Sequence, residues 1–126
     1  MKLIDCFMYF DEDLVLEIRL NTLSKIVDKF VIVEATKNHA GQDKKLNFDI
    51  NNFSKFKDKI HYIIIDNLPS NVKSSKKSWH ENHIRDQFQR NCLSKGYKNS
   101  DPNDWIMISD IDEIPDPEKI KEFNVK

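Results

Sequence analysis

The sequence WIMISDIDEIP, residues 105–115, decides how the rest of the chain is interpreted. Its first four residues are large and apolar, which is typical of a buried strand, and Asp110, Asp112 and Glu113 follow at the strand's end. Two aspartates separated by one residue can face one cation there. Mg²⁺ and Mn²⁺ prefer such oxygen ligands and share them with substrate phosphates. The stretch therefore predicts a metal and phosphate site at Asp110 and Asp112. The alternative interpretation is a solvated acidic turn, with Asp116 as a helix cap.

Three earlier segments show the same arrangement of an apolar run that ends in polar or acidic residues. They are residues 3–10, residues 30–33 before Glu34, and residues 61–65 before Asp66. Apolar, aromatic and β-branched residues dominate them, as in buried strands. Strand, helix and strand in succession favour parallel pairing, and ligands bind at the carboxyl ends of parallel strands. Glu34, Thr36 and Asp66 are therefore candidate ligand contacts. The alternative for Glu34 is a capping acid in a loop.

Helical periodicity separates these strands. In the first helix one apolar face is formed by Leu16, Leu20, Leu23, Val27 and Phe30. We expect Glu17 and Arg19 to lie off this face and to be solvated, with a buried ion pair as the alternative for Arg19. Shorter helices are expected near residues 51–57 and after Asp116, where Pro117 follows a capping acid. The pattern predicts an α/β protein with a mainly parallel sheet flanked by helices.

A further helix is predicted to begin at Ser78, because Ser78 and Glu81 match a capping box and an apolar stripe continues to Gly96. This helix carries Arg85 and Arg90. The planar guanidinium group of arginine matches phosphate oxygens, so an arginine that faces the crevice is a candidate contact for a diphosphate. The alternative is an exposed arginine on the surface of a helix.

The composition excludes some classes of partner. The 126 residues fit one domain, and 20 Lys and Arg against 21 Asp and Glu leave no electrostatic footprint for nucleic acid or an anionic membrane. No apolar run approaches the ~20 residues of a membrane span, and the N-terminus does not have the pattern of a signal peptide. We therefore expect a cytoplasmic protein. Cys6 and Cys92 are expected to be free, buried thiols.

Six segments along the chain resemble the nucleotide-sugar glycosyltransferases of family 17, which are related to the enzymes that add the bisecting N-acetylglucosamine to N-glycans. The matching segments are IDCF (4–7), LEIRLN (16–21), VDKFVIVEAT (27–36), FKDKI (56–60), FQRN (88–91) and ISDIDEIP (108–115). Each is weak alone. Their occurrence in the family's order, at approximately the family's spacing, makes the resemblance specific.

The resemblance implies a GT-A-type, Rossmann-like fold that holds a nucleotide-sugar donor at the ends of its strands. Asp110 and Asp112 would hold Mn²⁺ or Mg²⁺ and bridge it to the donor diphosphate. Glu34 and Asp66 would flank the base or ribose, and Arg90 would contact the diphosphate or the nucleotide. The implied partners are a UDP-sugar donor and a glycan acceptor.

The reaction that the resemblance implies is transfer of a sugar, N-acetylglucosamine in the related enzymes, with inversion at the anomeric carbon. A metal offsets charge on the leaving phosphates, and a general base takes the proton of the acceptor hydroxyl. Glu113 is the candidate base that the sequence offers. Family members continue beyond the acidic motif with an acceptor-binding half and carry a membrane anchor. The chain is therefore expected to be one donor-binding domain over residues 1–126, and Golgi residence is not implied.

Two other functions stay open. The first is a haloacid-dehalogenase-like phosphotransferase, because Asp110 and Asp112 resemble the nucleophile motif of that class. That chemistry needs its nucleophile on an early strand with further catalytic residues downstream, which argues against it. The second is a non-catalytic module that binds a nucleotide or a partner protein in the same crevice.

Overall fold

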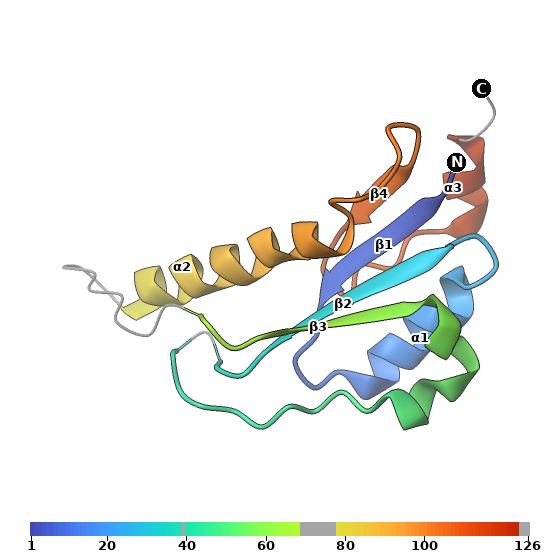
Figure 1. Cartoon of the computed structure of the whole chain (residues 1–126). Helices are drawn as coiled ribbons and strands as arrows, with labels where there is room; N and C mark the ends of the chain where they lie inside the picture. The colour runs from blue at the N-terminus through green and yellow to red at the C-terminus, as the bar shows by residue number, and fades with distance from the viewer. Residues whose placement is uncertain (39, 69–77, 124–126) are drawn as a thin grey trace.

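Four parallel strands form the central sheet of the computed structural model, which describes residues 1–38, 40–68 and 78–123, residues 78–82 by backbone alone (Figure 1). The strands are β1 (Leu3–Met8), β2 (Lys29–Ala35), β3 (Ile60–Ile65) and β4 (Trp105–Ile108). Their order is β3-β2-β1-β4. Each pairing is parallel, and Cys6 of β1 pairs with Val31 of β2 and Ile108 of β4. The predicted α/β class with a parallel sheet is confirmed.

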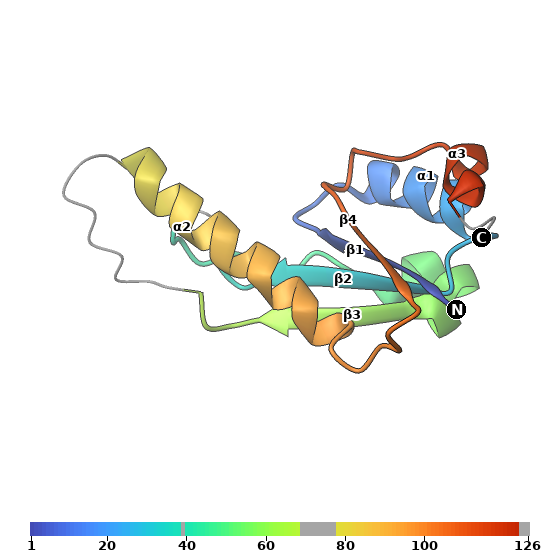
Figure 2. The same cartoon turned by 90° about the horizontal axis from the view of Figure 1, so that it is seen from above.

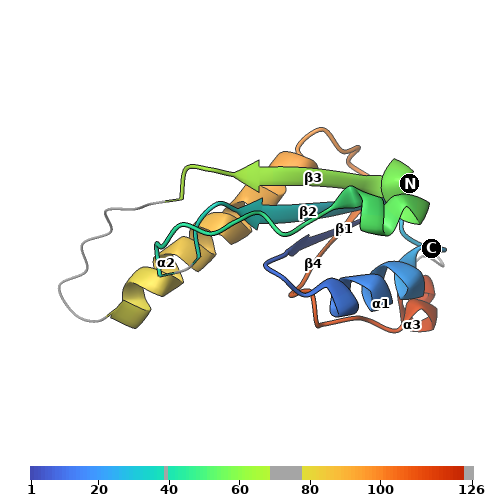
Figure 3. The same cartoon turned by 90° about the horizontal axis from the view of Figure 1, so that it is seen from below.

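Helices cover both faces of this sheet, as Figures 2 and 3 show from opposite sides. Helix α1 (Asp13–Leu23), the 3-10 helix η1 (Ile50–Lys59) and the short helix α3 (Pro117–Glu122) pack on one face. Helix α2 (Ser78–Asn91) continues into the 3-10 helix η2 (Cys92–Gly96), which packs on the other face. The helices expected near residues 51–57 and after Asp116 are both present.

Alternation along β1 builds one hydrophobic core on each face. Leu3 and Phe7 point toward α1 and η1, whereas Ile4 and Cys6 point toward η2. Each large apolar side chain buried in this way contributes roughly 1.5–3 kcal/mol. Asp5 lies between Leu3 and Phe7 in the sequence, so its carboxylate points toward α1, and it is 0% exposed. A buried carboxylate on this face requires a partner.

That partner is Arg19, and the prediction that Arg19 is solvated is wrong. The Arg19 and Asp5 side chains are both 0% exposed, and their closest oxygen and nitrogen atoms are 2.6 Å apart. Arg19 lies on the buried face of α1 with Leu16 and Leu23, because positions three and four apart share one side of a helix. The alternative, a buried ion pair, is confirmed. Glu17 is exposed as expected.

Helix α1 ends at Leu23, before the position that the periodicity predicted. Leu3 donates its N–H to Asp28 Oδ2 at 2.8 Å, and the Asp28 N–H donates to the Leu3 carbonyl at 2.9 Å. These bonds align the start of β2 with the start of β1, so the chain leaves the helix early. Val27 and Phe30 still enter the same core.

The other predicted features agree with the structure where it describes them. Helix α2 begins at Ser78, although the side chains of the proposed capping box, Ser78 and Glu81, lie outside the described residues. Asp116 Oδ1 accepts the Glu118 N–H at 2.9 Å, which confirms this cap. Both cysteines are buried and free. Within the described residues, no helix has the length and apolar character needed to cross a membrane.

Candidate donor site

The carboxyl ends of β1 and β4 border a cavity of about 540 Å³. Its lining comes from the chain after β1, the start of α1, the second half of α2 and the residues after β4. Tyr9, Phe10, Arg90, Asp110 and Asp112 are among the residues that line it. Ligands of parallel α/β sheets bind at this edge, outside the carboxyl ends of the strands. This cavity is therefore the candidate functional site.

Residues 109–113, which we term the acidic turn, fold back on themselves directly after β4. The Glu113 N–H donates to the Asp110 carbonyl at 2.9 Å, and the Asp110 N–H donates to Glu113 Oε1 at 2.8 Å. Ile111 is 7% exposed and anchors the turn in the core. The Asp110 and Asp112 side chains are exposed toward the cavity. The Glu113 carboxylate thus helps to close the turn that presents the two aspartates.

Arg19 lies beneath the acidic turn and contacts its backbone. Arg19 Nη1 lies 3.0, 3.2 and 2.9 Å from the carbonyl oxygens of Asp110, Ile111 and Glu113, respectively. Nη2 donates to Ser109 Oγ at 2.7 Å. Nε and Nη2 also donate to the two carboxylate oxygens of Asp5, at 2.8 and 2.6 Å. One guanidinium group therefore connects β1, α1 and the acidic turn.

Arg90 reaches the acidic turn from α2. Its Nη2 lies 3.0 Å from Asp110 Oδ1 and 3.7 Å from Asp86 Oδ2. The hydrogen bond to Asp110 raises the pKa of the Arg90 guanidinium group, so it remains a fixed positive charge. The Arg90 side chain is 34% exposed, which leaves it accessible from the cavity. The structure thus brings together three residues that the sequence proposed, Arg90, Asp110 and Asp112.

Tyr9 forms part of the cavity wall but is not a ready proton acceptor. Its hydroxyl donates to Asp13 Oδ1 at the start of α1. Burial and this hydrogen bond raise the pKa of the Tyr9 phenol above its ordinary value. Phe10, the next residue, is 44% exposed at the same cavity. The cavity therefore offers an aromatic side as well as an acidic side.

The donor set of this cavity suits a hard divalent cation that takes some of its ligands from a substrate. Asp110 and Asp112 supply carboxylate oxygens, the ligands that Mg²⁺ and Mn²⁺ prefer. Among the described residues, no three His, Cys, Asp or Glu side chains converge as a set of metal ligands. Such cations commonly retain water and bind substrate phosphates beside one or two carboxylates. The residues present therefore fit a cation shared with a diphosphate.

The three other predicted donor contacts lie away from this cavity. Glu34 is 0% exposed, and its two oxygens accept hydrogen bonds from Lys44 Nζ, the N–H groups of residues 47 and 48, and the Tyr62 hydroxyl, at 2.6–3.1 Å. The Thr36 N–H donates to the Ile65 carbonyl at 2.9 Å. Asp66 is exposed at the end of β3, beyond β2 from the acidic turn. Their roles toward a donor stay predictions.

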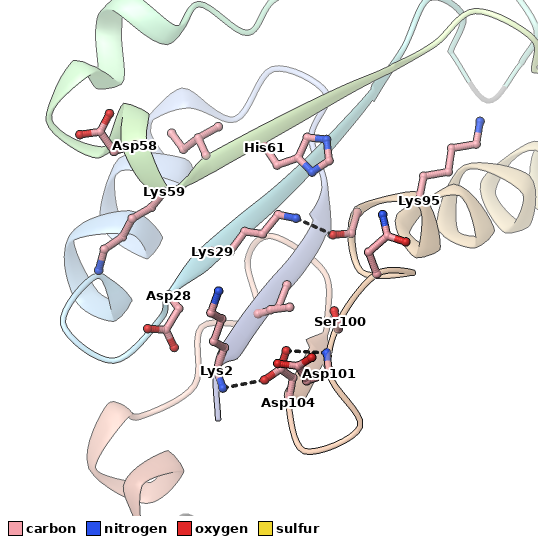
Figure 4. A pocket seen from close by; sticks show the side chains of 14 residues that line it. Lys2, Asp28, Lys29, Asp58, Lys59, His61, Lys95, Ser100, Asp101 and Asp104 are labelled. Carbon is pink, nitrogen blue, oxygen red and sulfur yellow. Dashed lines mark hydrogen bonds between the residues drawn. The ribbon is translucent and has the colours of Figure 1, made fainter.

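A second cavity of about 540 Å³ lies at the opposite end of the sheet, where the strands begin (Figure 4). Several of its charged groups hold backbone atoms of the fold. Lys29 Nζ donates to the Gly96 carbonyl at 2.8 Å, and the Lys2 N–H donates to Asp104 Oδ1 at 2.9 Å. Lys59 donates to the carbonyls of Ser24 and Val27. These contacts give the charged groups a structural role.

Parts of the site that depend on tertiary contacts were not predicted from the sequence. Tyr9 and Phe10 were assigned to the first strand, which ends at Met8, and they instead form the cavity wall. The link from Arg19 to the acidic turn was also missed. The sequence did contain a signal for the pairing of Asp5 with Arg19. An acid inside an apolar strand and an arginine on an apolar helix face each require a buried partner.

Comparison with known proteins gives matches along the whole chain. The family model described as Glycosyltransferase family 17 matches residues 1–125. Two curated relatives are the beta-1,4-mannosyl-glycoprotein 4-beta-N-acetylglucosaminyltransferases of Homo sapiens and Rattus norvegicus. Each is 28% identical over 108 residues, which cover 79% of this chain and 19% of the relative. The chain thus spans about a fifth of the length of these relatives. No solved structure gives a significant match.

Proposed function

Because this chain belongs to glycosyltransferase family 17, we propose that it is the donor-binding part of a metal-dependent glycosyltransferase. The donor is a uridine diphosphate sugar, the transferred sugar is N-acetylglucosamine, and the acceptor is a glycan that attacks with inversion. The name of the two relatives, an N-acetylglucosaminyltransferase, supports this choice of sugar. The observation that carries the proposal is the acidic turn, which presents Asp110 and Asp112 to a cavity at the carboxyl edge of a parallel sheet.

Acidic and basic side chains of the cavity have different proposed roles in binding a diphosphate. Asp110 and Asp112 would hold Mn²⁺ or Mg²⁺, and the metal would supply positive charge against the negative charge that develops on the leaving phosphates. Arg90 Nη2 pairs with Asp110 Oδ1 at 3.0 Å. The planar fork of its guanidinium group matches phosphate oxygens, so Arg90 would also bind the donor diphosphate beside Asp110.

Glu113 is the acid of the turn that remains for proton transfer. Its Oε1 accepts the Asp110 N–H at 2.8 Å, which fixes the carboxylate in one orientation. The second carboxylate oxygen, Oε2, is the atom that would accept the proton of the acceptor hydroxyl. A base has to lie within hydrogen-bond reach of the proton that it takes. We therefore propose Glu113 as the base only for an acceptor that approaches along the outer side of the acidic turn.

The experiment that tests the proposal is calorimetric titration of UDP into the protein with Mn²⁺ and with EDTA. We expect binding only with the metal, and we expect Asp110→Asn with Asp112→Asn to abolish it. Asp58→Asn is the matched control, because it makes the same chemical change in an exposed acid at the opposite end of the sheet. Binding that persists in EDTA or in the double variant would contradict the proposal.

A separate assay distinguishes the alternative functions. Metal-dependent UDP binding without hydrolysis of a UDP-sugar or transfer to any glycan would favour a non-catalytic nucleotide-binding module. Hydrolysis of a phosphate monoester that is lost in Asp110→Asn would favour the phosphotransferase. Family membership supports sugar transfer over both.

A further inference from the structure

We propose that the buried pair of Arg19 and Asp5 consists of positioning residues that set the relative orientation of the Asp110 and Asp112 carboxylates. This inference rests on the proposed function of the acidic turn as a metal and diphosphate site. Neither residue lines the cavity, and both are 0% exposed. Their effect on a bound cation would therefore be exerted through the backbone of the acidic turn.

Arg19 holds the acidic turn through its backbone carbonyls. A single nitrogen, Nη1, lies within 3.2 Å of three carbonyl oxygens, those of Asp110, Ile111 and Glu113. Three carbonyls can point at one nitrogen only if the backbone curls around it. The Ile111 side chain enters the core, whereas the side chains of Asp110 and Asp112 line the cavity. The guanidinium group thus determines which way the turn faces.

The Asp112 carboxylate, unlike that of Asp110, is positioned by its backbone. Asp110 is held by Arg90 at its carboxylate and by Glu113 at its N–H. Within the described residues, the Asp112 carboxylate makes no hydrogen bond or ion pair, and it is exposed. Its location therefore follows from the backbone on either side of it, where Arg19 binds the carbonyls of residues 111 and 113. A preorganised pair of carboxylates binds a cation more tightly than a mobile pair.

Asp5 fixes the orientation of the Arg19 guanidinium group. Asp5 binds Nε and Nη2 with its two oxygens, an arrangement that fixes the plane of the guanidinium group. The N–H groups that Asp5 leaves free then point toward the acidic turn, where Ser109 Oγ takes a further bond from Nη2. Lysine in place of Arg19 would keep the positive charge beside Asp5. Its single nitrogen could not also reach the three carbonyls, because lysine lacks the planar fork.

The test compares Mn²⁺ affinity in the presence of UDP among the wild type, Arg19→Lys and a structural control. Electron paramagnetic resonance measures free and bound Mn²⁺ directly, so no catalytic activity is needed. The control is Lys59→Met, which removes another cation that holds two backbone carbonyls, at the opposite end of the sheet. All proteins are measured at a temperature at which circular dichroism shows them folded.

We expect Arg19→Lys to weaken Mn²⁺ binding by about 10- to 100-fold, the usual effect of removing a group that orients a metal ligand. Lys59→Met is expected to bind Mn²⁺ as the wild type does, even if it lowers the melting temperature as much as Arg19→Lys does. A purely structural role for Arg19 predicts the reverse, a loss of stability with unchanged affinity, and that result would overturn the inference. Equal weakening in both variants would also overturn it.

A milder variant keeps the test decisive if Arg19→Lys does not fold. Ser109→Ala removes one bond from Arg19 Nη2 at a partly exposed position. We expect it to weaken Mn²⁺ binding in the same direction, by about two- to fivefold, and unchanged affinity would overturn the inference. If the wild type itself fails to bind Mn²⁺ with UDP, the proposed function falls, and this inference falls with it. Binding by the wild type that is insensitive to Arg19 and Ser109 overturns this inference alone.

Discussion

Substitution of Gly96 by alanine is expected to destabilise the protein strongly, because the site has no room for a methyl group. A Cβ atom at Gly96 would lie 2.3 and 2.6 Å from the two γ carbons of Val31. Val31 is 0% exposed in β2, where it pairs with Cys6 and His61, so it cannot move aside. The bond from Lys29 Nζ to the Gly96 carbonyl, drawn in Figure 4, holds the glycine in place.

The magnitude follows from the steric overlap. The backbone at Gly96 does not have a positive φ, so alanine meets no conformational penalty there. Overpacking a well-filled core usually costs about 1–3 kcal/mol, and two contacts shorter than 3 Å place Gly96→Ala at the upper end, about 3 kcal/mol. Urea denaturation measures this loss. Lys95→Ala, on an exposed neighbour, is the control and should change the free energy of unfolding by less than about 0.5 kcal/mol.

A double-mutant cycle decides whether the overlap with Val31 is the cause. Val31→Ala alone leaves a cavity and is expected to cost about 2 kcal/mol. In that background the alanine methyl at position 96 fills the space that valine vacated, so Gly96→Ala should cost less than about 1 kcal/mol. The coupling energy is then about 2 kcal/mol. Additive costs would refute the packing argument and would point to a backbone change in η2.

Two other predictions concern buried groups. Glu34→Gln leaves Lys44, the lysine that pairs with it, unneutralised and should lower the free energy of unfolding by about 3 kcal/mol in urea. Burial raises the pKa of the Cys6 thiol to about 12. The unfolded chain loses this proton near the ordinary value of 9.0 and the folded chain retains it, so stability is full below pH 9 and is lost as pH rises toward 12. The loss should be up to about 1.4 kcal/mol per pH unit, and Cys6→Ala should flatten the slope between pH 9 and 10.

The strands could be predicted because their signal is local. Each is a short apolar run that ends in polar residues, and the predicted fourth strand coincides with β4, Trp105–Ile108. The start of α2 and the cap at Asp116 were also predicted, since capping residues act within one helical turn. The end of α1 was not, because the bonds between Leu3 and Asp28 join the start of β1 to the residue before β2, which lie far apart in the sequence.

The candidate site was predictable only at its acidic side. Asp110 and Asp112 were proposed from their residue type and their spacing. Arg90 was proposed from its place on a helix near the crevice. Glu34 was proposed from its position at a strand end, but position alone does not show which way a carboxylate points. Its oxygens are turned into the protein, where four donors occupy them. Orientation depends on the packing of distant segments, which a single sequence does not display.

Two buried carboxylates on neighbouring strands explain why the carboxyl edge of the sheet has a defined shape. Asp5 orients Arg19, which binds carbonyl oxygens of the acidic turn, whereas Glu34 accepts N–H groups of the chain around Asn47. Asn47 in turn donates to the Phe10 carbonyl at 2.7 Å, beside the cavity. Buried ion pairs add little net stability over apolar residues of the same volume. Their more specific effect is to fix backbone groups of the acidic turn and of the chain around Asn47, and the proposed site for a cation and a diphosphate requires that fixed geometry.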